Sequence, residues 1–473
     1  MDEKLRRLYQ NQSVLIKGSF FAFAGGMVGS FLTYLFQLVA GRFLSPSDYG
    51  TLISLRSLMV YAGLLSSALQ TALTKKVSEL SGEKRWEDIA FLFWSGFRYL
   101  AFTALVVFAV LCLLALPLAK FLQVLDLKLI IFSAAAAAGG YLLIGPASFL
   151  SGLWRFKALS LIIAVNSGLL LITALAAISF GWGLGGIMGA HVIAPLATVV
   201  LAVVLLQKNV RRSDFKLGKN NFVAEIAKFT GPTLLISVSL MAFYNSDILL
   251  VKHFFSAEQA GIYSSASVVG RIIFFGTSMV TGVMFPVVSG KKAAGEDYRA
   301  IFFGALSLVC LGAIGLGAIY FLFPTQVVRV LFGQTYFDAI PLLPYFAVFM
   351  GVYSVLNLFS NFFLAVKNFF IAPVLLAGAL AQAGAIWFWH ESLVQVISVS
   401  ALIAGVLVVF SFGLFYFTPS FLLKANNNPN RKPPPCHIPK LKSFWTIYKF
   451  RRNMITVTAI LCLIYTLSVK LSS

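Results

Sequence analysis

The chain has 473 residues, of which 59% are hydrophobic and 11% charged, with a mean hydropathy of +0.89 and a net charge of +21. A soluble domain carries roughly 25% charged residues, so this composition excludes a soluble globular protein and indicates one whose surface faces lipid. The excess of Lys and Arg is interpreted as loop charge that orients membrane helices, and no nucleic-acid partner is expected.

The apolar segments predict a chain of membrane-spanning helices. A span needs roughly 20 mostly apolar residues. The charged start, Met1 to Asn11, precedes an apolar segment without a small-residue cleavage site, so that segment is predicted to be the first helix rather than a cleaved signal peptide. The sequence predicts an all-α, polytopic membrane protein with twelve spans near residues 13–40, 49–74, 89–118, 128–151, 158–180, 185–206, 226–252, 260–286, 300–323, 339–365, 370–389 and 393–417.

The distribution of basic residues predicts the orientation of these spans. With the N-terminus inside, the cytoplasmic segments contain 27 Lys and Arg residues and the outside loops contain 5. Basic residues concentrate on the cytoplasmic side of membrane proteins. We therefore expect a multi-pass protein of the cell membrane with a cytoplasmic N-terminus, and the other side is called the predicted outer side below.

The longest cytoplasmic loop divides the helices six and six. We expect an N-terminal six-helix lobe over 1–206, the inter-lobe loop over 207–225 and a C-terminal six-helix lobe over 226–423. A basic cytoplasmic tail over 424–453 then either contacts anionic lipid or remains solvated. An extra hydrophobic segment follows over 454–473, and its apolar part, Met454 to Val469, is either a thirteenth span or an interfacial segment.

Two stretches of sequence repeat at an offset of 211 residues. RFLSPSDYGTLIS, from Arg42 to Ser54, matches HFFSAEQAGIYSS, from His253 to Ser265. Each follows the first helix of a six-helix half, and its Ser is predicted to cap the next helix, with an acidic residue near the positive helix end. Because six helices return the chain to its starting side, the halves are parallel repeats. Such repeats are related by a pseudo-two-fold axis along the membrane normal, which is an architecture of transporters.

These repeated motifs resemble those of a known family. GRFLSPSDYGTL and NSDILLVKHFFSAEQAGIYSSASVVGRI are similar to the polysaccharide-transport (O-antigen flippase-like) members of the multidrug/oligosaccharidyl-lipid/polysaccharide exporter superfamily, and the resemblance covers roughly residues 13–417. It implies a flippase that moves a lipid-linked oligosaccharide, carried on a polyprenyl pyrophosphate, from the inner to the outer leaflet. Members have twelve or fourteen helices, so one extra segment at 454–469 departs from the pattern.

Charged residues at membrane depth are costly and mark candidate sites. Arg56 and Arg271 lie too deep to reach the headgroups and are predicted to bind an anionic substrate through their planar guanidinium groups, with Asn245 nearby. Asp247 is the only acidic residue in a predicted span, and either pairs with these arginines between the lobes or binds a coupling H⁺ or Na⁺. Lys17 and Arg98 lie near the cytoplasmic mouth of the expected cavity, where their side chains can extend to the headgroups.

Three functions are compatible with these observations. The leading one is a lipid-linked oligosaccharide flippase that works by alternating access. A cation-coupled multidrug exporter is the second, although two deep Arg residues against one Asp favour an anionic substrate. The third is a membrane enzyme that modifies polysaccharide. The four histidines show no spacing that joins them into a site, and no phosphate-binding loop is recognisable. We therefore expect no enzyme activity, no cofactor and no metal site, and membrane lipids as additional partners.

Overall fold

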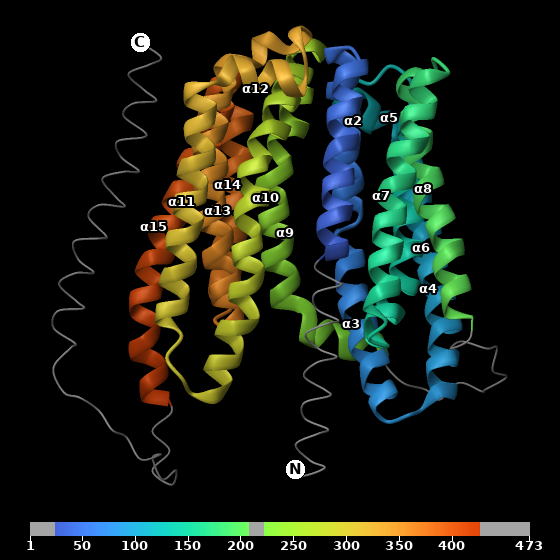
Figure 1. The fold of residues 1–473 in the computed structure, drawn as a ribbon, viewed down its shortest axis with the longest axis vertical. Coiled ribbons are helices and arrows are strands. Elements are labelled where there is room, and N and C mark those ends of the chain that lie inside the picture. Colours follow the sequence, from blue (N-terminus) through green and yellow to red (C-terminus); the bar gives the residue numbers. More distant parts are fainter. Residues whose placement is uncertain (1–23, 208–221, 426–473) are drawn as a thin grey trace. The chain divides into compact units, whose positions relative to one another are not determined.

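In the computed structural model, residues 24–207 and 222–425 are described, and their secondary structure is entirely helical (Figure 1). Eleven helices within these ranges are long and apolar enough to cross a membrane. The all-α membrane fold is therefore confirmed. Lys17, the inter-lobe loop, the basic tail and the segment at 454–469 lie wholly or largely outside the described residues.

The helices follow one another with short connections. The first helix is Ala24–Phe43. The rest of the first half contains α2 (Pro46–Ala62), α3 (Leu64–Gly82), α4 (Trp86–Leu113), α5 (Ala115–Phe121), α6 (Leu127–Gly152), α7 (Phe156–Ser179) and α8 (Gly183–Leu206). The second half contains α9 (Phe222–Phe254), α10 (Ala257–Ala294), α11 (Arg299–Leu322), α12 (Pro324–Leu331), η1 (Gln334–Leu342), α13 (Leu343–Ala365), α14 (Ile371–Phe388) and α15 (Leu393–Ala425).

The second predicted helix, 49–74, is longer than expected and is divided in two. α2 ends at Ala62 and α3 begins at Leu64, while Gly63 between them keeps right-handed helical angles (φ −74°, ψ −8°). The Tyr141 hydroxyl of α6 donates to the Ala62 carbonyl at 2.7 Å, which satisfies an acceptor at this break. Because α2 and α3 continue in one direction, they serve as one crossing (Figure 1). Together with the eleven long helices they account for the twelve predicted spans.

The described residues pack into two units that do not follow the division of the sequence into halves. The first unit comprises those within Met1–Val268, Thr325–Ile340 and Leu375–Val396, and the second comprises those within Val269–Pro324, Pro341–Val374 and Ile397–Ser473. In the first unit, α6 packs against α4 and α8, and α7 packs against α8. In the second unit, α11 packs against α13, and an aromatic cluster around the fully buried Phe302 ties α11 to α13 and α15.

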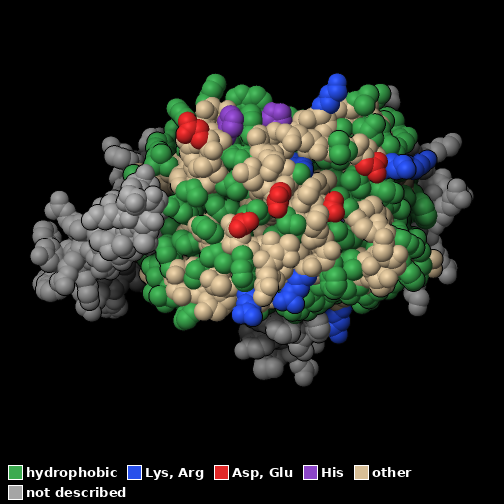
Figure 2. Space-filling model, turned by 90° about the horizontal axis from the view of Figure 1, so that it is seen from above, with side chains coloured by type: hydrophobic (Ala, Val, Ile, Leu, Met, Phe, Trp, Pro, Cys, Tyr) green, Lys and Arg blue, Asp and Glu red, His purple; other side chains and the backbone are tan. Residues whose placement is uncertain are grey.

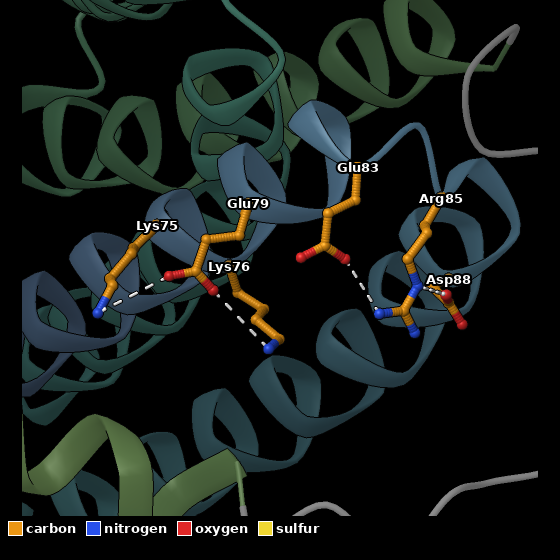
Figure 3. A network of polar contacts seen from close by, with 6 residues as sticks. All are labelled: Lys75, Lys76, Glu79, Glu83, Arg85 and Asp88. Carbon is orange, nitrogen blue, oxygen red and sulfur yellow. Dashed lines mark hydrogen bonds and ion pairs between the residues drawn. The ribbon is translucent and has the colours of Figure 1, made fainter.

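A small group of ion pairs lies along the last turns of α3, the turn after it and the start of α4 (Figure 3). Arg85 contacts Asp88 at 2.6 Å and Glu83 at 3.1 Å, while Lys75 and Lys76 approach Glu79 at 3.8 Å. The Asp88 carboxylate, as the hydrogen-bond acceptor, raises the pKa of Arg85 above its ordinary value. Exposed ion pairs contribute little to stability, so this group is best interpreted as a charged, water-facing turn on the predicted cytoplasmic side.

The serines of the repeated motif begin equivalent helices, as predicted. Ser45 caps α2, where its hydroxyl accepts a hydrogen bond from the Asp48 amide at 3.2 Å. Ser256 does the same for α10, accepting from the Gln259 amide at 3.2 Å, and the Gln259 side chain accepts in return from the Ser256 amide. This reciprocal arrangement is a capping box. The sequence repeat is therefore also a repeat of local structure.

Candidate functional site

α2 is the element that gathers the polar groups of the first unit. It packs against α6, α8 and α9, and its middle turns carry Arg56 and Ser57. Pro46 lies ten residues before Arg56, which places the Arg56 Cα roughly 15 Å along the helix from its first residue. The site is therefore at membrane depth, on the half of the span nearer the predicted outer side.

One side of this site is a polar interface between α2, α9 and α10. The Ser57 hydroxyl lies 3.5 Å from Asn245 Oδ1, and the Asn245 amide nitrogen donates to the Met241 carbonyl at 3.1 Å. Tyr263 of α10 donates to Asp247 Oδ2 at 2.7 Å, and both residues are fully buried. Asn245 and Asp247 thus occupy the same short stretch of α9, and each is engaged by a hydroxyl from a neighbouring helix.

The other side is formed by the first helix, α2 and α8. The Arg56 guanidinium carbon lies 5.6 Å from the centre of the Phe36 ring, within the range of a cation–π interaction. His191 of α8 meets the same ring edge-on, with ring centres 5.1 Å apart. Arg56 is partly exposed, whereas His191 is 9% exposed and Phe36 is fully buried. A cation and a buried imidazole therefore share one aromatic neighbour.

The remaining predicted residues lie elsewhere. Arg271 is on α10 in the second unit and is 7% exposed. Arg98 is exposed on α4, and Lys17 is outside the described residues. The structure thus brings Asn245 and Asp247 together next to the helix that carries Arg56, and it describes Arg271 in a separate group. Anion binding, ion coupling and pairing between the lobes stay predictions for all of these residues.

The two repeated motifs meet each other within the first unit. Gly50 and Gly261 are equivalent positions of the repeat, and a Cβ added to Gly50 would lie 2.6 Å from the Gly261 nitrogen. A Cβ added to Gly261 would overlap the Pro46 carbonyl oxygen. These glycines are required because the backbones of α2 and α10 touch here. The motif therefore has a second role besides capping, as a contact between the two sequence halves.

Further contacts between the halves lie close to this glycine pair. The Arg42 guanidinium donates to the Leu331 carbonyl at 3.2 Å and also to the Val330 carbonyl, and Tyr336 donates to the Leu44 carbonyl at 3.3 Å. All of these groups belong to the first unit and to segments predicted to lie on the outer side. Figure 2 is a view onto this end of the molecule, where acidic, basic and histidine side chains are scattered among apolar ones.

Sequence reasoning missed three contributors to the site. Ser57 and Tyr263 have no charge, so nothing in the sequence distinguished them from other residues of apolar helices. His191 was visible as a lone histidine within a span, but its proximity to Phe36 depends on how α8 packs. Among the described residues, no group of three or more His, Cys, Asp and Glu side chains could hold a metal ion.

Known structures share this fold. An inward-facing multidrug resistance MATE family transporter of the MOP superfamily superposes with a TM-score of 0.73 at 14% identity, over 86% of this chain and 99% of that one. The lipid II flippase MurJ in an inward closed conformation superposes with a TM-score of 0.66 at 14% identity, over 96% and 98%. An outward-facing multidrug resistance MATE family transporter of the MOP superfamily gives a TM-score of 0.62 at 14% identity, over 87% of this chain and 96% of that one.

A search of curated protein sequences found no match. The model of a family described as polysaccharide biosynthesis protein matches residues 39–341, which is more than half of the chain and includes both repeated motifs, Arg56, Asn245, Asp247 and Arg271. On this match, and with a fold shared with transporters of the MOP superfamily, the chain belongs to the polysaccharide biosynthesis protein family.

Proposed function

We propose that the protein is a flippase that moves a lipid-linked oligosaccharide, a precursor of a polysaccharide, across the cell membrane by alternating access. The family match supports a role in polysaccharide biosynthesis. The similarity in fold to the lipid II flippase MurJ supports a lipid-linked substrate. The chain carries a pyrophosphate-linked sugar while the lipid tail stays in the bilayer, and it performs no covalent chemistry.

The observation that carries this proposal is the partly exposed guanidinium of Arg56 at membrane depth. A charge in this position is costly unless it faces water or a ligand. A guanidinium donates two parallel hydrogen bonds to phosphate oxygens and stacks on aromatic rings. Arg56 therefore binds the pyrophosphate of the substrate, and Arg271, which is 7% exposed in the second unit, is a further candidate for anion binding.

Alternating access requires a contact that closes one side and opens in the other state. The Gly50–Gly261 contact and the Arg42 and Tyr336 hydrogen bonds close the predicted outer side. Their separation releases the oligosaccharide outward. Asp247 is the site of the coupling H⁺ or Na⁺, or it pairs with arginine as the halves rock, and the Tyr263 hydroxyl holds its carboxylate in either role.

A cation-coupled multidrug exporter is the second candidate, supported by the fold shared with MATE transporters. Such an exporter of cationic drugs favours an acidic pocket. Arg56 on Phe36 and the buried Arg271 favour an anion instead. The flippase is therefore the better supported function.

The test is a flipping assay with purified protein in liposomes that contain a fluorescent polyprenyl-pyrophosphoryl oligosaccharide. Label in the outer leaflet is quenched by an added reductant, so flipping appears as further loss of fluorescence. Wild type is compared with the Arg56→Ala and Arg271→Ala variants. Arg329→Ala is the matched control, because Arg329 is an exposed arginine of α12 that is not among the residues proposed to bind the substrate.

We expect wild type and Arg329→Ala to flip the lipid. Arg56→Ala and Arg271→Ala should flip it at least tenfold more slowly, which corresponds to a loss of roughly 1.4 kcal/mol of transition-state stabilisation. Equal flipping rates for all four proteins would support the flippase but contradict the role of Arg56 and Arg271 in binding the substrate. Absence of flipping by wild type, with and without a proton or sodium gradient, would contradict the flippase. The same liposomes are then assayed for efflux of a cationic dye.

A further inference from the structure

His191 differs from an ordinary core histidine because one of its ring nitrogens has no partner. Nδ1 lies 3.0 Å from the Ile187 carbonyl, one helical turn earlier in α8. A carbonyl only accepts hydrogen bonds, so Nδ1 carries the hydrogen, and Nε2 of the neutral ring presents a lone pair. Nε2 is buried and makes no hydrogen bond to any described residue. The fold thus keeps a proton acceptor buried at membrane depth.

The depth of His191 matches that of Arg56. His191 lies eight residues into α8 and Arg56 ten residues into α2, so both are roughly 12–15 Å from the helix ends on the predicted outer side. Their common neighbour is Phe36, which touches the imidazole edge-on and lies beneath the guanidinium. The two groups are therefore close enough for the charge on one to affect the other.

The helices that pack around His191 carry one acidic residue within their described ranges. These helices are the first helix, α2, α6 and α7. Their charged and titratable residues are Tyr34, Arg42, Asp48, Tyr49, Arg56, Tyr61, Lys128, Tyr141 and Lys157. Asp48 is the only acid in this set, and it lies in the first turn of α2, about 12 Å along the helix from Arg56.

We propose that His191 Nε2 is a proton-binding site linked to anion binding at Arg56, so that a pyrophosphate-bearing substrate enters the site together with a proton. This inference rests on the anion-binding role of Arg56 in the proposed function. Without the anion, a proton on His191 would place a second positive charge beside Arg56. A bound polyanion adds negative charge beside both groups and stabilises the imidazolium.

Linkage makes the effect reciprocal. If anion binding favours protonation of His191, protonation must favour anion binding by the same factor. For one linked proton, the affinity for the anion changes by at most about tenfold per pH unit and rises as the pH falls. The proposed proton at His191 also differs from a coupling ion at Asp247 in its direction of movement. The proton at His191 crosses in the same direction as the substrate, whereas a coupling ion at Asp247 crosses in the opposite direction.

The test is calorimetry of inorganic pyrophosphate binding to the purified full chain at pH 7 in two buffers of different ionisation enthalpy. The difference between the buffers gives the number of protons taken up. Wild type is compared with Arg56→Gln, His191→Asn and His390→Gln. The Asn amide can still donate to the Ile187 carbonyl but cannot bind a proton. His390 is the matched control, because its Nδ1 is also buried without a partner but lies outside the α2–α8 site.

We expect wild type and His390→Gln to take up about one proton more per bound pyrophosphate than His191→Asn. Equal uptake by His191→Asn and wild type, with binding intact, would overturn the proton site and leave the proposed function standing. If wild type does not bind pyrophosphate, or if Arg56→Gln binds it as tightly as wild type, Arg56 is not an anion site and both proposals are wrong. If His191→Asn fails to fold, NMR of labelled wild-type histidines decides, because one imidazole must gain a proton when pyrophosphate is added.

Discussion

The hydrogen bond between Tyr263 and Asp247 is the shortest polar link in the α9–α10 part of the site, at 2.7 Å between fully buried side chains. A hydrogen bond to a charged group contributes roughly 1.5–3 kcal/mol. The position also explains why an acidic residue is tolerated at this depth, since a fixed hydroxyl replaces part of the water that a carboxylate loses.

We expect Tyr263→Phe to lower the free energy of unfolding by about 1.5–3 kcal/mol. The reason is that the carboxylate keeps its buried position and loses this donor. The measurement is thermal unfolding in detergent, with Asp247→Asn to show whether the loss depends on the charge. Tyr345→Phe is the control, because the Tyr345 hydroxyl makes no hydrogen bond to the described residues. Equal stability of both tyrosine variants would show that the Tyr263 bond is not stabilising.

At the scale of single residues, the sequence identified charges but not their partners. Arg56, Asn245 and Asp247 stand out because polar groups in apolar helices are rare and costly. Phe36 and His191 do not stand out in the sequence, because their contact depends on how the first helix and α8 are rotated about their axes. The apolar pattern of the sequence does not specify this rotation when most faces of a helix are hydrophobic. The same reason hides Ser57 and Tyr263.

The contact between α2 and α10 is the feature of the helices that depends most on residue size. Both Gly50 and Gly261 sit where a Cβ would meet backbone atoms, so neither helix can yield by rotating a side chain. Overpacking costs about 1–3 kcal/mol. Because the two copies of the motif contact each other at these glycines, a substitution in either copy disturbs the packing of both sequence halves.

We expect Gly261→Ala to separate α2 from α10 and to shift the population away from the outer-closed state by roughly 5- to 150-fold, as a coupling energy of 1–3 kcal/mol implies. The measurement is the rate at which a maleimide labels a Ser54→Cys variant, since Ser54 is fully buried just behind the contact. Gly282→Ala, where a Cβ meets nothing within 4 Å, is the control on the same helix. A labelling rate that Gly261→Ala leaves unchanged would contradict the closing role.

The helices themselves were predictable, and their interruptions were not. Apolar length placed all the described spans, because the bilayer fixes how long such a segment must be. The break at Gly63 escaped notice because the glycine has ordinary helical angles and the flanking residues are apolar on both sides. The predicted helix at 89–118 likewise ends early, at Leu113, and α5 continues after one residue. Neither change alters the number of crossings.

For the whole molecule, the meeting of Gly50 with Gly261 is informative because the two are equivalent positions of the repeat. A residue touches its own equivalent only near the symmetry axis that relates the two copies. Parallel repeats have this axis along the membrane normal. The glycine contact is therefore the place, within the first unit, where the two copies of the motif at an offset of 211 residues meet.

The sidedness of the molecule follows from treating α2 and α3 as one crossing. In that case the turn at Glu83 and the turn at Glu296 face the cytoplasm, and Leu125 and Glu391 face outside. If the break at Gly63 instead returned the chain to its starting side, Glu83 and Leu125 would exchange sides. The bias of basic residues toward one side favours the first arrangement.

We expect a membrane-impermeant maleimide to label Leu125→Cys and Glu391→Cys in intact cells, and Glu83→Cys and Glu296→Cys only after permeabilisation. Each variant is made without the native cysteines, and all four positions are exposed, so access to the reagent depends on the side alone. Labelling of Glu83→Cys in intact cells together with protection of Leu125→Cys would contradict the single crossing.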